Sequence, residues 1–89
     1  MATVTAIIGS TVGLHARPAA KFTRAAATAP VDVTIALGDG EPVDAASMLS
    51  VMTLGVQFGA EVTLRAEGEG AEDALRSLAE LLATDLDEA

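Results

Sequence analysis

The fold of this chain is decided by residues 31–40, VDVTIALGDG, which combine a strand pattern with a turn signal. Apolar residues alternate with other residues over 31–37, which predicts a strand with one apolar face. That face consists of Val31, Val33, Ile35 and Leu37. The two glycines and the aspartate of 38–40 are typical of a hairpin turn. We therefore expect a short strand around 41–44 to pair back, antiparallel, with 31–37.

The same reasoning, carried outward from this hairpin, assigns the rest of the chain. Alternating patterns predict two further strands, over 3–8 and 61–67. Helical spacing, caps and prolines predict three helices, over about 15–28, 47–54 and 71–84. The last helix has its apolar stripe at Ala71, Ala74, Leu75, Leu78 and Leu82. Because each strand carries its large apolar residues on one face, we predict an α+β fold of order βαββαβα. In this open-faced β-sandwich, three helices cover one face of a four-stranded antiparallel sheet.

Length and composition indicate a single small domain that spans residues 1–89. The 89 residues leave no room for a second core, and a hydrophobic content of 51% makes disorder improbable. The absence of cysteine excludes disulfides and thiolate zinc sites. The N-terminus lacks the pattern of a signal peptide, and no apolar run approaches the ~18 residues of a membrane-spanning helix. We expect a cytoplasmic monomer that does not insert into a membrane.

The charge distribution indicates an acidic molecule with one basic zone. A net charge of -8 argues against nucleic acid as a partner, because phosphate backbones attract basic surfaces. All 13 acidic residues lie from Asp32 onward, so Arg17, Lys21 and Arg24 are unopposed in the first 31 residues. These three cations have the spacing i, i+4 and i+7, which places them on one helix face. Such a stripe would steer an acidic partner, although a basic stripe is more often a solvated helix face.

His15, the only histidine, stands at the start of the first predicted helix. A helix start offers unpaired N–H groups and a partial positive charge, which bind anions and favour a neutral, nucleophilic imidazole. Arg17 adds a planar fork that suits phosphate oxygens. These features suit phosphoryl transfer, which depends mainly on positioning and charge stabilisation. From position alone, a solvated or capping histidine is the commoner case; only the coincidence of helix start, Arg17 and Pro18 makes the two interpretations equally open.

Two motifs resemble those of the HPr family, the histidine-containing phosphocarriers of the bacterial sugar phosphotransferase system. Residues 13–19, GLHARPA, are similar to the family's active-site motif. Residues 47–55, SMLSVMTLG, resemble its regulatory-serine helix at the proper distance, and residues 59–62, GAEV, resemble the entry to its last strand. The likeness extends over the whole chain, and the predicted element order is that of the family.

The resemblance implies a phosphocarrier that is not an enzyme and that needs neither metal nor cofactor. His15 would accept a phosphoryl group on Nδ1 from enzyme I and give it to enzyme IIA domains. Arg17 and the amides of the helix start, that of Ala16 included, would hold the phosphoryl oxygens. Met48, Leu49 and Val51 are implied to form an apolar docking patch near His15, which would add to the partner contacts expected of the cations Lys21 and Arg24. For Met52 and Leu54 we favour plain core packing.

Ser47 matches the serine that a dedicated kinase modifies in some members of the family. Ala46 stands before it where members often have lysine, and Val12 stands where many have a small polar residue near the imidazole. From its place at a helix start, Ser47 could equally be a cap and nothing more. A serine kinase is therefore a further candidate partner, and the two interpretations of Ser47 remain open.

Three other classes of protein are weaker alternatives. An acyl carrier protein is also small and acidic, but residues 44–49 lack its DSL attachment motif, and three clear strands argue against an all-helical carrier. A non-catalytic regulator on the same fold would not need His15 and Arg17. A metal-binding module is disfavoured because one histidine without cysteine offers too few soft ligands.

Overall fold

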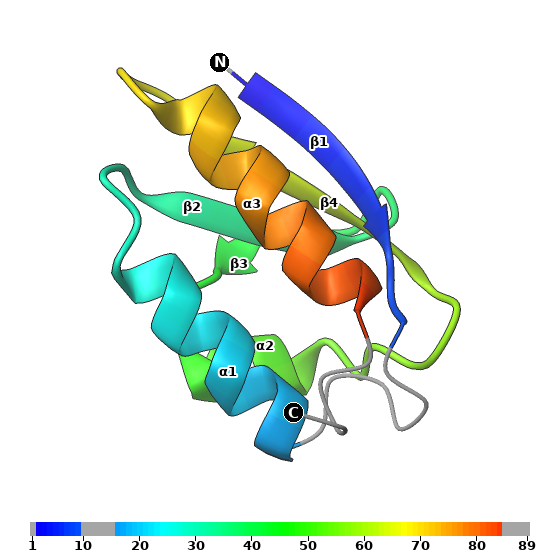
Figure 1. Ribbon diagram of the computed structural model, residues 1–89. Coiled ribbons are helices and arrows are strands. Elements are labelled where there is room, and N and C mark those ends of the chain that lie inside the picture. Colours follow the sequence, from blue (N-terminus) through cyan, green and yellow to red (C-terminus); the bar gives the residue numbers. More distant parts are fainter. Residues whose placement is uncertain (1, 10–15, 85–89) are drawn as a thin grey trace.

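The computed structural model describes residues 2–9 and 16–84, in which four strands form one antiparallel sheet (Figure 1). The strands are β1 (Ala2–Ile7), β2 (Val33–Leu37), β3 (Val43–Asp44) and β4 (Glu61–Ala66). Their order across the sheet is β1-β4-β2-β3, with every neighbouring pair antiparallel. The predicted hairpin is confirmed, because Ile35 of β2 lies opposite Val43 of β3.

The two faces of this sheet differ in character, as the alternation of apolar residues predicts. On the covered face, buried residues line up across the strands, with Ile35 of β2 opposite Leu64 of β4. The other buried members of that face are Ala6, Val33, Val62 and Ala66. The opposite face has no helix over it in the described structure and consists largely of Thr3, Thr5, Thr34, Thr63 and Arg65. The sandwich is therefore open on one side.

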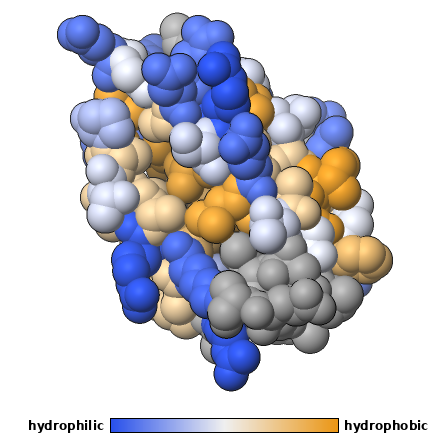
Figure 2. Space-filling view, in the orientation of Figure 1, coloured by the Kyte–Doolittle hydropathy of each residue, from blue (hydrophilic) through white to orange (hydrophobic). Residues whose placement is uncertain are grey.

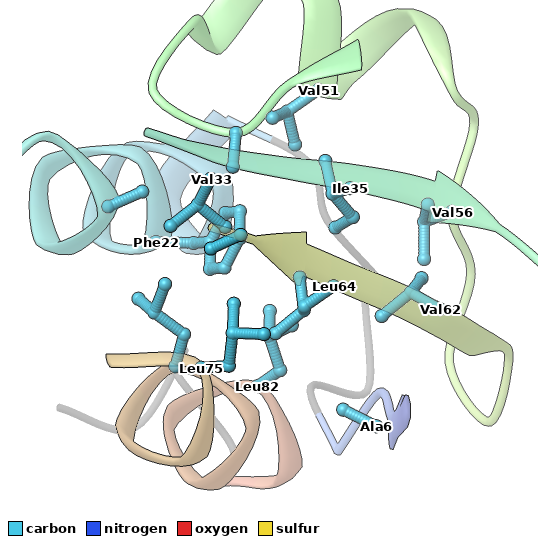
Figure 3. Close-up of a cluster of buried hydrophobic side chains, with 14 of the residues drawn as sticks. Ala6, Phe22, Val33, Ile35, Val51, Val56, Val62, Leu64, Leu75 and Leu82 are labelled. Atoms are coloured by element: carbon cyan, nitrogen blue, oxygen red, sulfur yellow. The ribbon is translucent and has the colours of Figure 1, made fainter. Parts of the chain in front are cut away.

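Three helices cover the apolar face: α1 (Ala16–Ala27), α2 (Met48–Thr53) and α3 (Ala71–Ala83) (Figure 1). Their buried side chains meet those of β2 and β4 in one core, and Figure 3 shows Phe22 and Leu75 directed toward the sheet. In α3 the buried residues are Ala71, Leu75, Leu78 and Leu82. The predicted stripe is confirmed except at Ala74, which is half-buried. The predicted α+β architecture is confirmed.

The ends of β2 and β3 differ from those predicted. The strand β2 begins at Val33 instead of Val31, and its last residue, Leu37, is 38% exposed because the sheet ends there. The strand β3 contains two residues where four were predicted. Pro42, which has no N–H to donate, directly precedes it, so the ladder begins only at the next residue.

Gly9 fixes the end of the β1 segment against the C-terminus of α3. Its N–H donates to the carbonyl oxygen of Leu82 at 2.9 Å, which satisfies one of the carbonyls left unpaired at a helix end. A β-carbon on Gly9 would overlap the carbonyl group of Ala83, so only glycine fits this close approach. The chain is thus anchored immediately before residues 10–15.

Candidate functional site

The structure describes the helix that follows His15, but not His15 itself. The helix α1 is described from Ala16, the next residue in the chain, and Arg17 lies in its first turn with an exposed side chain. His15 and the side chain of Ala16 lie outside the described residues. The role of His15 as phosphoacceptor therefore stays a prediction, supported by the position of the helix.

The helix α1 has one buried and one charged face. Ala19, Phe22 and Ala26 are buried against the core, and Pro18 beside Arg17 is buried as well. The predicted basic residues lie on the other face: Arg17 and Arg24 are exposed and Lys21 is half-buried. Figure 2 shows hydrophilic side chains along this outer side of α1, at the lower left of the view. Burial of the apolar face thus holds the predicted cationic stripe toward solvent.

Described acidic residues do not neutralise the two arginines of this stripe. The ion pairs seen in residues 2–9 and 16–84 belong to Arg76 of α3, which lies 3.6 Å from Glu72 and 3.6 Å from Asp73. Neither Arg17 nor Arg24 pairs with an acid in the same part of the chain. Both guanidinium groups are consequently available to an anion or to an acidic surface.

Ser47 is the N-cap of α2, as one of the two interpretations of the sequence predicts. The N–H of Ser50 donates to Ser47 Oγ at 3.3 Å, and the N–H of Val51 donates to the Ser47 carbonyl at 2.9 Å. Asp44 stabilises the turn before Ser47, because its carboxylate accepts a hydrogen bond from the N–H of Ala46 at 2.9 Å. The capping role of Ser47 is confirmed, and its modification by a kinase stays a prediction.

Two predictions about apolar residues of α2 are wrong, those for Val51 and Met52. Leu49 is 77% exposed and Met48 37%, as expected for partner contacts, but Val51 is fully buried in the core. Met52, predicted to be a core residue, is 41% exposed. The reason is geometric, because positions 48, 49 and 52 of a helix share one side while 51 points away from it. Leu54, half-buried, packs against the core as predicted.

The helices α1 and α2 pack against each other, so the cations and the exposed apolar side chains lie on adjacent helices. Phe22 of α1 and Val51 of α2 belong to the same core and hold the two helices together (Figure 3). We call the outer side of this pair the docking surface; it consists of Arg17, Lys21, Arg24, Met48, Leu49 and Met52. Its arginines and methionines are residue types enriched in protein interfaces.

Other features of the described structure give no competing site. A hollow of about 770 Å³ lies at the opposite, C-terminal end of α1, where it is lined by Pro30, Val31 and Arg65 among others. No cluster of histidine and acidic residues able to hold a metal ion occurs in the described ranges. Within the same ranges, no helix is long and apolar enough to cross a membrane.

The family model described as "PTS HPr component phosphorylation site" matches residues 2–84, which is nearly the whole chain and includes His15. The chain belongs to the HPr family. HPr proteins are phosphocarriers, not enzymes, and work in the phosphotransferase system with enzyme I and enzyme IIA.

Known HPr proteins match this chain in both sequence and structure. The phosphocarrier protein HPr of Streptomyces coelicolor is 56% identical over 81 residues, which cover 91% of this chain and 87% of that protein. The HPr-like protein Crh of Bacillus subtilis is 46% identical over 67 residues, covering 75% and 78% of the two chains. A crystal structure of HPr from Thermoanaerobacter tengcongensis superimposes with a TM-score of 0.89 at 37% identity, over 100% of this chain and 99% of that one.

Sequence reasoning missed one conspicuous exposed residue, Phe58, which is 61% exposed. It lies between the end of α2 and the start of β4, next to Gly59. No local sequence signal marks this ring as exposed, because the turn that carries it is hydrogen-bonded to Ile8, far away in the sequence.

Proposed function

We propose that His15 accepts a phosphoryl group from phospho-enzyme I and passes it to enzyme IIA domains in sugar uptake. The observation that carries this proposal is the motif GLHARPA at 13–19, which lies within the family match, together with an exposed Arg17 in the first turn of α1. A phosphocarrier needs a nucleophile that solvent and partners can reach, beside a fixed cation. The motif places His15 two residues before Arg17, and the exposed side chain of Arg17 supports the role of the cation.

The proposed relay consists of two successive displacements at phosphorus, one that loads His15 and one that unloads it. The lone pair of the neutral His15 Nδ1 forms the new N–P bond while the bond between phosphorus and the donor breaks. In the second step, the N–P bond breaks while a nucleophile of the IIA domain forms a bond to phosphorus. Arg17 and the N–H groups at the start of α1, that of Ala16 included, would stabilise the charge on the phosphoryl oxygens during both steps.

The docking surface is the proposed contact region for both partners. Its cations, Arg17, Lys21 and Arg24, would attract an acidic partner, while Met48, Leu49 and Met52 would fill apolar depressions on it. We propose that the protein works as a monomer in the cytoplasm, where enzyme I and phosphoenolpyruvate supply its phosphate. Sedimentation at micromolar concentration would show a single species of about 9 kDa for this 8.9 kDa chain.

We further propose that phosphorylation of Ser47 by a serine kinase regulates the relay. Ser47 is the N-cap of α2, next to Met48, so a phosphate on its hydroxyl would stand at the edge of the docking surface. A charge of about -1.5 to -2 there would repel an acidic partner drawn by the α1 cations. Capping of α2 and regulation through the same hydroxyl are compatible, because a modified oxygen still accepts hydrogen bonds.

Incubation with enzyme I and phosphoenolpyruvate tests the proposed relay. The chain should take up one phosphoryl group in an acid-labile, base-stable linkage, as expected of a phosphohistidine, and should lose it when a IIA domain is added. An acid-stable adduct, or an adduct that a IIA domain does not discharge, would contradict the proposal.

A further inference from the structure

Gly9 is held in place by hydrogen bonds of its own backbone and of the residue before it. The N–H of Ile8 donates to the Ala60 carbonyl at 3.0 Å, and the Ile8 carbonyl accepts from the N–H of Gly59 at 3.0 Å. The N–H of Gly9 itself donates to the Leu82 carbonyl at 2.9 Å, in the last turn of α3. The chain therefore continues beyond Gly9 from a fixed point.

The helix α1, which follows residues 10–15, is fixed to the same core as Gly9. Phe22 of α1 belongs to one buried cluster with Ile8, the neighbour of Gly9, and Leu82 of α3. Figure 1 shows the end of β1, the last turn of α3 and the start of α1 in the lower half of the molecule. Residues 10–15, of which His15 is the last, thus connect two fixed points of one core.

Space, and not a left-handed φ, is what requires glycine at position 9. The φ of Gly9 lies outside the left-handed region, unlike that of Gly68 or Gly70. A β-carbon on Gly9 would lie 2.6 Å from the carbonyl carbon of Ala83, whereas carbon atoms in contact are normally about 3.5–4.0 Å apart. The substitution Gly9→Ala must therefore push this point of the chain away from α3, by roughly 1 Å.

We propose that Gly9 is a positioning residue for phosphoryl transfer, because its close contact with the end of α3 sets the point from which the chain runs to His15. The inference rests on the proposed function, since it concerns the same phosphoacceptor. Phosphoryl transfer depends mainly on positioning, and a misplacement of about 1 Å can cost about a hundredfold in rate. Gly9 is not part of the docking surface, so a shift there acts on the transfer step and not on partner binding.

Steady-state transfer by Gly9→Ala tests this role, both for loading by enzyme I and for unloading to a IIA domain, with the full chain as the varied substrate. In both steps kcat should fall about tenfold or more, because the reacting groups are misplaced. The KM for the chain should stay within about twofold, because the docking surface is unchanged. All rates are measured at a temperature at which circular dichroism shows every variant folded, so a merely structural role of Gly9 would leave kcat unchanged.

The control is Gly68→Ala, which makes the same change in the turn between β4 and α3, at the other end of that helix. Gly68 has a φ of 110°, and a β-carbon there would lie 3.1 Å from Val31 Cγ1, so this substitution is also strained. Its melting temperature should fall while its kcat stays at the wild-type value. An unchanged kcat for Gly9→Ala, an equal fall for Gly68→Ala, or a rise in KM without a change in kcat would each overturn the proposal.

A second variant keeps the test decisive if Gly9→Ala does not fold. One glycine inserted between Gly9 and Ser10 preserves every described contact of Gly9 and only lengthens the connection to His15, so the melting temperature should stay within ~2 °C of wild type. The kcat should again fall, because a longer connection restrains the imidazole less. A wild-type kcat for this insertion would also overturn the proposal. If the wild-type chain took up no phosphate at all, the proposed function would fail, and this inference with it.

Discussion

In the first turn of α1, Arg17 and the residues that follow it have different roles. Its guanidinium group is exposed in the first turn, while Pro18 and Ala19 beside it are buried and hold the helix in place. No described acidic residue pairs with Arg17, so no such ion pair of its guanidinium group contributes to the stability of the fold. A residue with these properties is expected to contribute to phosphoryl transfer far more than to stability.

Substitution of Arg17 by lysine separates these two contributions. Arg17→Lys keeps the positive charge but loses the planar fork that binds two phosphoryl oxygens at once. We expect transfer from enzyme I to slow by about tenfold, measured in rapid-quench experiments, and the free energy of unfolding to change by less than ~0.5 kcal/mol. Lys21→Arg, a conservative change one turn along the same stripe, is the control and should transfer at the wild-type rate. Equal transfer rates for Arg17→Lys and wild type would show that the guanidinium fork of Arg17 does not act in phosphoryl transfer.

The helix α2 combines a structural cap with an exposed apolar side. Ser47 Oγ accepts from the N–H of Ser50, Val51 anchors the helix in the core, and Leu49 projects into solvent. Changes at Ser47 should therefore act on folding or on docking according to the group that replaces the hydroxyl.

Two substitutions of Ser47 should give opposite results. Ser47→Asp keeps an acceptor for the helix start and adds a negative charge, so it should melt within a few degrees of wild type but accept phosphate from enzyme I markedly more slowly. Ser47→Ala removes the acceptor and adds no charge, so it should lose about 0.5–2 kcal/mol of stability and transfer normally. Calorimetry and the labelling assay measure the two effects. If Ser47→Asp accepted phosphate at the wild-type rate, Ser47 would act only as a helix cap and not in regulation.

The molecule as a whole is acidic, and its basic zone is confined to α1. With a net charge of -8, the chain would repel another acidic protein over most of its surface, so association depends on how the partner is oriented. The cations of α1 supply that orientation. Association with enzyme I should consequently weaken as salt rises, because exposed charges are screened beyond ~10 Å at 0.1 M.

Two double variants of equal charge distinguish local steering from net charge. Lys21→Glu with Arg24→Glu, and Arg65→Glu with Arg76→Glu, each make the net charge four units more negative than -8. The first pair lies on α1, whereas Arg65 lies on the open face of the sheet and Arg76 on α3. We expect the first double variant to lower the association rate constant at low salt by about tenfold or more, and the second to lower it much less. Stopped-flow measurements that found equal losses would show that net charge alone controls association.

The sequence predicts the elements of this fold more accurately than their ends and exposed residues. Periodicity identifies α3 and β4 because long-range packing agrees with the local pattern there. It fails at β3, where Pro42 shortens the ladder, and at Val51 and Met52, because a six-residue helix has too few turns to reveal which side is buried. The exposure of Phe58 follows from hydrogen bonds to the distant Ile8, which no local pattern shows.

The central claim is that His15 is the sole phosphoacceptor of the chain. The most direct test is intact-mass measurement of wild type and His15→Ala after incubation with enzyme I and phosphoenolpyruvate. Wild type should gain one phosphoryl group, and His15→Ala, with a circular dichroism spectrum and melting curve like those of wild type, should gain none. A folded His15→Ala variant that still gained a phosphoryl group would contradict the account.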